Sequence, residues 1–276
     1  MGRTTDRRIR IAKESAAVIR VSRQKLGRMA RRFGLQSARS RQAAAQALAE
    51  YDGMLDVLSA RTGTLPCTSK AQLKQDMAAL VCTGFKRGGF FIDIGAADPV
   101  QSSNTVMLER SFGWTGICAE PNPVFHDALR AQRRCAVDER CVWTTTGDIK
   151  SFHFSQANTL STLSEFVSCD HHADARAQGR VGSVETVSLN DLLLAHGAPP
   201  HVDFLSMDTE GSELAILNAF NFESTTFGFI SIEHNYAPNR AAIHDLLVRK
   251  GYMRIWTRLS AWDDWYIPIT AGQIVA

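Results

Sequence analysis

An acidic residue near the end of an apolar segment marks the first candidate binding site in the chain. Asp93 interrupts the run FFIDI, and the small residues Gly95, Ala96 and Ala97 follow it. A buried carboxylate is costly unless a partner compensates its charge, and small residues let a ligand approach the backbone. A strand that ends in an acid and such a turn is typical of the crevice in which an open α/β sheet binds nucleotides. We therefore expect a cofactor at this turn.

A second acidic residue, Glu120, follows the next strand expected along the chain, over residues 114–119. An acid at the end of the second strand of a βαβ unit can accept hydrogen bonds from both hydroxyls of a ribose. A third strand is expected over residues 141–144, and Thr145 follows it at a position where an adenine ring could lie. These strand ends together predict a nucleoside site.

Four carboxylates gather around the strand expected over residues 202–207. They are Asp203, Asp208, Glu210 and Glu213. Like charges this close are unfavourable unless they bind a substrate cation, a metal ion, a cofactor amine or a helix N-terminus. A position at the start of a helix explains Glu213, but it does not explain Asp208 at the end of a buried strand. Asp208 is therefore a candidate ligand-binding residue.

Polar residues also follow the strand expected over residues 229–232. Among them, His234 is the best-placed general base of the chain, because the unperturbed pKa of histidine lies near neutral pH. A histidine with a purely structural role is the alternative interpretation of this residue.

The segments between these strands have the apolar spacing of helices, so strand and helix alternate along the chain. Helices are expected over residues 70–85, 106–112, 125–134, 213–220 and 241–250, and an antiparallel strand pair over 252–257 and 264–267. This alternation predicts an α/β fold with a mostly parallel sheet. Residues 158–182 interrupt it, and such irregular insertions usually serve as lids, substrate loops or disordered segments. His171, His172 and Asp174 within them could bind a metal ion, but adjacent histidines in a loop are better explained as solvated residues.

The N-terminal segment differs from the remainder in charge. Residues 1–41 hold 13 Lys and Arg and two acids, about +11, although the whole chain has a net charge of +3. We expect a basic helical extension and linker over residues 1–65 and a catalytic domain over residues 66–276. A basic amphipathic helix can contact an anionic membrane surface or nucleic acid. A partner-protein contact, a self-association arm and a solvated extension are the other interpretations.

Cysteine usage and hydropathy indicate the compartment. The six cysteines include no C-x-x-C pair, which argues against a disulfide framework or a zinc site and favours a reducing compartment. No apolar run approaches the length of a membrane span, and the N-terminus lacks the apolar region of a secretory signal. We expect a cytoplasmic protein, with peripheral association at the inner membrane surface left open by the basic arm.

Several motifs occur in a fixed order and resemble those of the FkbM family of S-adenosylmethionine-dependent methyltransferases. They are FIDIGAAD at 91–98, SNT at 103–105, EPNP at 120–123, SMDTEGSE at 206–213 and IEHN at 232–235. The resemblance covers about residues 75–268 and leaves out the basic arm. It implies a Rossmann-like class I methyltransferase fold, with a seven-stranded, mostly parallel sheet and helices on both faces. It also implies O-methylation of a hydroxyl, often on a sugar, a polysaccharide or a polyketide.

The resemblance also implies roles for single residues. Asp93, Gly95 and Ala96 would line the methionine part of the cofactor, Glu120 would hold the ribose, and Asp208 would lie beside the amino-acid end or the reacting centre. With the strand ends, it gives the expected cofactor-binding set Asp93, Gly95, Ala96, Asp98, Asn104, Thr105, Glu120, Pro121, Asn122, Thr145 and Asp208. One departure is Pro99, where the family usually has glycine. Proline fixes φ and donates no amide, so the turn after Asp98 is expected to differ.

The acceptor hydroxyl needs a base or a metal ion to remove its proton. His234 or Glu233 is the expected base, with Glu210 orienting it. A divalent ion held by Asp208, Glu210 and Glu233 is the alternative.

Three other functions compete with hydroxyl methylation. A nicotinamide-dependent oxidoreductase would also use Glu120, but it would usually carry G-x-G-x-x-G, and only Gly95 follows Asp93. A non-catalytic module could keep the fold and dock through its arm. A nucleic-acid methyltransferase would bind nucleic acid in a salt-sensitive manner that depends on residues 1–41.

Overall fold

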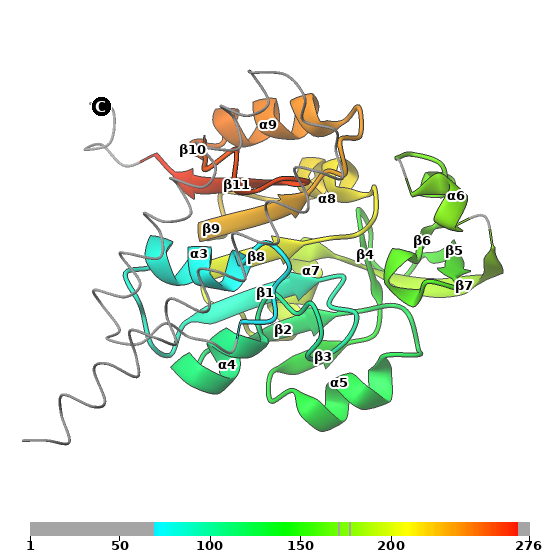
Figure 1. The fold of residues 1–276 in the computed structure, drawn as a ribbon, viewed down its shortest axis with the longest axis horizontal. Coiled ribbons are helices and arrows are strands. Elements are labelled where there is room, and N and C mark those ends of the chain that lie inside the picture. The colour runs from blue at the N-terminus through cyan, green and yellow to red at the C-terminus, as the bar shows by residue number, and fades with distance from the viewer. Residues whose placement is uncertain (1–68, 171, 177, 270–276) are drawn as a thin grey trace, which may run out of the picture. The chain divides into compact units, whose positions relative to one another are not determined.

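The computed structural model describes residues 69–170, 172–176 and 178–269 (Figure 1). The helical extension and linker expected over residues 1–65 lie outside the described residues, so the extension and its boundary with the catalytic domain stay predictions. Within the described part of the chain, no helix is long and apolar enough to cross a membrane.

A seven-stranded sheet forms the centre of the fold, as predicted. Its order is β10 (Tyr252–Ile255), β11 (Asp263–Pro268), β9 (Thr226–Glu233), β8 (His201–Met207), β1 (Phe90–Ile94), β2 (Thr115–Ala119) and β3 (Ala136–Asp138). The five strands from β9 to β3 pair in parallel, and β11 pairs antiparallel with both β9 and β10. Chain order reverses on either side of β1, so the crevice in which such sheets bind ligands lies at the ends of β1 and β8.

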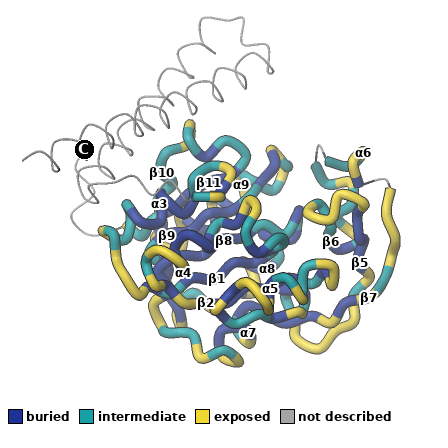
Figure 2. Tube along the Cα trace, turned by 60° about the horizontal axis from the view of Figure 1, so that its bottom comes forward, coloured by how far each residue is buried: buried dark blue, intermediate teal, exposed yellow. Residues whose placement is uncertain are grey.

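Helices cover both faces of this sheet (Figure 1). They are α3 (Gln75–Cys82), α4 (Val106–Phe112), α5 (His126–Gln132), α7 (Leu189–Ala195), α8 (Glu213–Ala219) and α9 (Arg240–Arg249). Leu192 of α7, Leu217 of α8 and Leu247 of α9 share one core with Ile92 and Ile94 of β1. Since side chains alternate along a strand, the intervening Asp93 faces the opposite side of the sheet. The central strands β1, β2 and β8 are almost wholly buried (Figure 2), which explains their continuous apolar sequences.

Local signals explain where two of the helices begin and end. Gly113 adopts φ 68° and ends α4, because glycine enters the left-handed region without a steric penalty. Ser188 accepts a hydrogen bond from the backbone N–H of Asp191 at 3.1 Å and so caps α7.

A second, four-stranded sheet lies beside the first and corrects the expected third strand. Its order is β4 (Cys141–Trp143), β7 (Gly179–Ser188), β5 (Ile149–Ser155) and β6 (Thr162–Leu163). The strand expected over residues 141–144 therefore pairs with β7 in this sheet, and Ala136–Asp138 takes the place beside β2. Both candidate strands are only three residues long, too short for a pattern to decide between them.

The insertion over residues 158–182 is more regular than its sequence indicates. Besides β6 and the start of β7, it contains the short helices η1 (Asn158–Leu160), η2 (Ser164–Phe166) and α6 (Ala173–Arg176). A small core of Cys141, Phe152, Phe154, Leu163 and Val184 supports it and the second sheet. We call residues 158–176 the inserted segment.

Candidate active site

Two cavities open at the carboxyl ends of the central strands and meet there. The β2 cavity is lined by Glu120 and Pro121, and the β9 cavity by Ser231 and Glu233. Four residues line both cavities: Gly95, Ala97, Thr159 and Asp208. Because they share this wall, the two cavities form one site with two compartments.

Gly95 allows β1 and β8 to approach at the junction of the cavities. Its φ is +78°, and a Cβ at this position would lie 1.7 Å from the carbonyl oxygen of Asp208. Its N–H donates to the carbonyl of Ala119 at 2.9 Å, and the N–H of Asp208 donates to the carbonyl of Ile94 at 3.0 Å. Glycine is thus required at this position by the close contact with the backbone of Asp208, whether or not a ligand also approaches it.

Asp93 lines the β9 cavity and is held by a buried polar network. The Thr105 hydroxyl donates to Asp93 at 2.6 Å, and Arg133 Nη2 donates to the Thr105 hydroxyl at 2.8 Å. Burial raises the pKa of Asp93, while the charge of Arg133 and the bond from Thr105 oppose that rise. Thr105 is absent from the lining of both cavities and, instead of contacting a ligand directly as predicted, supports Asp93.

Glu120 presents a buried carboxylate at the end of β2. One oxygen accepts the N–H of Ala97 at 2.8 Å, and the other accepts the N–H of Asn122 at 2.7 Å. Burial raises the pKa of Glu120 to about 7. A carboxylate has about four acceptor positions, so the two backbone bonds fix this group and leave capacity for the hydroxyls of a ligand.

The far wall of the β2 cavity is apolar and comes from the second sheet. Val142, Phe152 and Leu163 line it. Thr145, expected beside an adenine, is exposed, is hydrogen-bonded to Asp148 and does not line either cavity. Because β4 turns into the second sheet, residues within that strand reach the cavity in place of the one that follows it.

The other expected cofactor residues take different positions. Asp98 accepts the N–H groups of Val100 and Gln101 at 2.9 and 2.7 Å, so it closes its own turn and lies outside both cavity linings. Asn104 lines the β9 cavity and donates to Ser206 at 3.0 Å.

Asn122 is also outside both linings. Its amide donates to the carbonyl of Asn158 at 3.3 Å and to the hydroxyl of Ser161 at 3.2 Å. Asn122 therefore connects the inserted segment to the end of β2. This position favours a structural role over the predicted contact with the cofactor. Ala96 and Pro121, in contrast, line the β9 and β2 cavities respectively.

Three carboxylates gather at the junction of the cavities. Asp208, Glu210 and Glu233 each offer an oxygen within 4.8 Å of the others. Burial raises the pKa of Asp208 to about 7 and that of Glu210 to about 9, and burial with the charges of Asp208 and Glu210 raises the pKa of Glu233 well above its ordinary value. Full ionisation of the cluster is therefore unfavourable in the ligand-free protein, and a positively charged ligand would stabilise the ionised form.

His234 faces away from the site, which corrects its assignment as general base. It follows Glu233 directly, and neighbouring side chains of an extended segment alternate in direction. Its Nε2 lies 3.7 Å from Asp264, its Nδ1 accepts the N–H of Tyr236 at 2.9 Å, and it does not line either cavity. Burial lowers the pKa of His234 to about 4. It is a neutral core histidine.

Some residues of the site carried no usable pattern in the sequence. Asp263 reaches the β9 cavity because β11 pairs with β9, and it accepts bonds from Ser231 at 2.8 Å and Gln75 at 2.9 Å. Trp262 also lines this cavity. Among the residues that the structure describes, no Lys, Arg or His lines either cavity.

The strand order, the antiparallel β11 and the site at the reversal of chain order define a class I methyltransferase fold. Residues 93–254 match the methyltransferase FkbM domain, which is more than half of the chain. The chain therefore belongs to the FkbM methyltransferase family, and methyl transfer is the activity that this membership supports.

The other comparisons add little. A comparison with curated proteins found no match. Among solved structures, the chain is similar to precorrin-6y C5,15-methyltransferase from Geobacter metallireducens GS-15, at 13% identity and a TM-score of 0.38, over 65% of this chain and 70% of that chain. A likeness at this level carries no argument about substrate.

Proposed function

We propose that the chain transfers the methyl group of S-adenosylmethionine to a hydroxyl of a sugar, a polysaccharide or a related natural product. The observation that carries the proposal is the pair of joined cavities, with the Glu120 carboxylate in one and the carboxylate cluster at the junction. This arrangement offers separate places for a cofactor and an acceptor that must meet at one point.

The residues of the β2 cavity fit a nucleoside. Glu120 has acceptor capacity for ribose hydroxyls, and Val142 and Leu163 offer an apolar wall for adenine. Asp93 and the junction carboxylates would hold the amino-acid end of the cofactor, because their negative charge complements its ammonium group. Ala96 would lie beside it. When bound, the cofactor supplies a methyl group activated by a positively charged sulfur. The absence of basic residues from the described linings favours such a cation.

Glu233 is the proposed proton acceptor for the hydroxyl. It lines the β9 cavity, and the amide of Asn235 donates to its Oε2 at 2.6 Å, which fixes its orientation. Burial and the neighbouring carboxylates raise the pKa of Glu233 in the ligand-free protein. The positive charge of a bound cofactor would lower that pKa again, so that Glu233 is ionised and can accept the proton of the hydroxyl. The methyl group of the cofactor is already activated for displacement. Apart from removal of the hydroxyl proton, positioning of the two reactants therefore supplies most of the rate enhancement.

A divalent ion is the second candidate for hydroxyl activation. Asp208, Glu210 and Glu233 offer hard oxygen donors close enough together to bind Mg²⁺ or Mn²⁺. Against this, Glu210 already forms an ion pair with Arg176. Treatment with EDTA followed by Mg²⁺ distinguishes the candidates, since loss and recovery of activity are expected only for metal-assisted transfer.

The β9 cavity supports a polyhydroxylated acceptor. Its lining includes the amide-bearing residues Gln72, Gln75, Gln101 and Asn104, and Trp262. Amides can donate to and accept from hydroxyls, and an aromatic ring packs against the apolar face of a sugar. Contact of residues 1–41 with a membrane surface or a partner protein, and self-association, remain separate proposals.

An acceptor screen with methyl-labelled S-adenosylmethionine tests this function. We expect label in neutral glycosides or polysaccharide fragments, attached to oxygen when the product is examined by mass spectrometry and NMR. Label in RNA or DNA would establish the nucleic-acid alternative instead. Cofactor binding without transfer to any acceptor in the screen would favour the non-catalytic module and contradict the proposal.

A further inference from the structure

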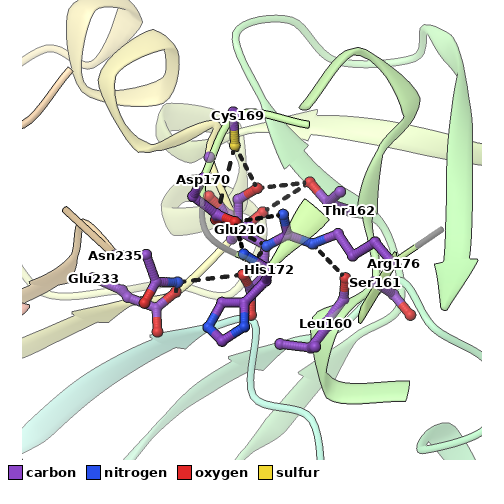
Figure 3. A network of polar contacts seen from close by, with 12 residues as sticks. Leu160, Ser161, Thr162, Cys169, Asp170, His172, Arg176, Glu210, Glu233 and Asn235 are labelled. Atoms are coloured by element: carbon purple, nitrogen blue, oxygen red, sulfur yellow. Dashed lines mark hydrogen bonds and ion pairs between the residues drawn. The ribbon is translucent and has the colours of Figure 1, made fainter. Parts of the chain in front are cut away.

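Arg176 lies in the inserted segment, and its side chain is completely buried. Its Nε donates to the carbonyl of Leu160 at 3.0 Å, and Nη1 and Nη2 bind the two oxygens of Asp170 at 2.8 and 2.9 Å (Figure 3). Nη2 also forms an ion pair with Glu210. A buried guanidinium is costly unless acceptors surround it. Here Leu160 and Asp170 of the same segment supply them, together with Glu210, which follows β8.

Glu210 is held in an unusual backbone conformation by the same segment. Its φ is +59°, a region that residues other than glycine rarely occupy unless their surroundings impose it. Its carbonyl accepts the Thr162 hydroxyl at 3.0 Å, and Cys169 Sγ lies 3.7 Å from that oxygen (Figure 3). Both the backbone and the side chain of Glu210 are thus bound by the inserted segment.

Through its bond to the Leu160 carbonyl, Arg176 also holds the backbone beside the junction of the cavities. Leu160 ends η1, and its neighbour Thr159 lines both cavities. Arg176 therefore touches the backbone beside Thr159 on one side and the carboxylate of Glu210 on the other. One side chain connects a wall residue from the inserted segment with a wall residue that follows β8.

We propose that Arg176 is a positioning residue for the cofactor site, which docks the inserted segment onto Glu210 and so fixes Thr159 and Glu210 at the junction of the two cavities. The proposal rests on the proposed function for the identity of the cofactor. Without the dock, the β2 cavity would lose a defined outer wall, since Asn158, Thr159 and Ser161 all belong to the docked segment.

The test compares Arg176→Gln with the matched variant Arg240→Gln. Arg240 also binds a buried carboxylate through two nitrogens, Asp264 at 2.9 and 2.7 Å, and it does not line either cavity. We expect Arg176→Gln to weaken S-adenosylmethionine binding by at least about tenfold in calorimetry and to speed amide hydrogen exchange over residues 158–170 in the ligand-free protein. Arg240→Gln should change neither quantity. Unchanged affinity and unchanged exchange in Arg176→Gln would overturn the proposal.

Two further variants separate positioning from general destabilisation. Arg176→Lys retains a charge that can bind Glu210 and should recover part of the affinity, even if Arg176→Gln folds poorly. In a cycle with Glu210→Gln, the double variant should lose little more than the worse single variant, because both changes break one connection. Fully additive losses would contradict an action through Glu210. If the wild type fails to bind S-adenosylmethionine, the proposed function fails, while the exchange measurement still decides whether Arg176 docks the segment.

Discussion

Replacement of Asp208 by Asn should abolish detectable methyl transfer and weaken S-adenosylmethionine binding by at least about tenfold, yet stabilise the ligand-free protein above pH 7. Asp208 lies at the junction of both cavities, where the carboxylate cluster favours a positively charged cofactor. In the ligand-free protein, burial and the neighbouring carboxylates oppose the ionisation of Asp208. The negative charge that favours cofactor binding therefore lowers the free energy of unfolding.

The sign of the stability effect follows from the pKa of Asp208. Burial raises its pKa in the folded protein to about 7, whereas an unfolded Asp titrates at about 3.9. Between these values the folded state keeps a proton that the unfolded state has lost, so the free energy of unfolding falls as the pH rises from about 4 to about 7. Asn cannot ionise and avoids this loss. Its stabilising effect should therefore grow over that range and level off above it.

Urea unfolding at pH 5 and pH 8 measures the effect, and Asp203→Asn is the matched control. Asp203 lies at the opposite end of β8, where it pairs with Lys86 at 2.8 Å and accepts the N–H of Phe90 at 2.9 Å. Its replacement should destabilise the protein at both pH values and leave cofactor affinity unchanged. Wild-type affinity in Asp208→Asn, or a loss of stability at pH 8, would show that Asp208 has another role.

Gly95→Ala is expected to destabilise the protein by about 3 kcal/mol or more and to remove cofactor binding. The new Cβ would lie 1.7 Å from the carbonyl oxygen of Asp208, and φ of +78° disfavours any side chain. Backbone atoms cannot move aside as a flexible side chain can, so β1 and β8 would have to separate at the site. For a domain of this size, the melting temperature should fall by about 6 °C or more.

Gly113→Ala isolates the backbone contribution. Gly113 has φ of +68° at the end of α4, but nothing lies within 4 Å of the added Cβ. This variant should lose only about 1 kcal/mol, from conformational strain, and it should bind S-adenosylmethionine like the wild type. Equal losses in the two glycine variants, measured by thermal unfolding, would mean that the contact with Asp208 is unimportant.

The fold and the cofactor side of the site could be predicted because their signals are local. Buried parallel strands are continuous apolar runs, and Asp93, Glu120 and Asp208 each follow or interrupt such a run. The carboxyl ends of parallel strands lie at one edge of a sheet, so their convergence follows from the strand assignment alone.

The errors arose where strand pairing or side-chain direction decides the outcome. His234 and Glu233 are adjacent in sequence, and only the position of β9 determines which of them faces the cavity. Thr145 lies outside the cavities because β4 pairs with β7. This pairing joins segments that are distant in the sequence. Arg176 lies in a segment without periodicity, and its partners Asp170 and Glu210 meet it only in the folded chain.

Calorimetric titration of S-adenosylmethionine into the wild type, Glu120→Gln and Asp98→Asn tests whether the β2 cavity holds the ribose of this cofactor. Both acids follow central strands, but only Glu120 lines a cavity, whereas Asp98 closes its own turn. We expect the wild type to bind one cofactor per chain and Asp98→Asn to bind it with wild-type affinity. In Glu120→Gln the affinity should be lower by about tenfold or more, because charge-assisted bonds to the ribose are lost. No binding to the wild type, or equal binding by Glu120→Gln, would contradict this role of the β2 cavity.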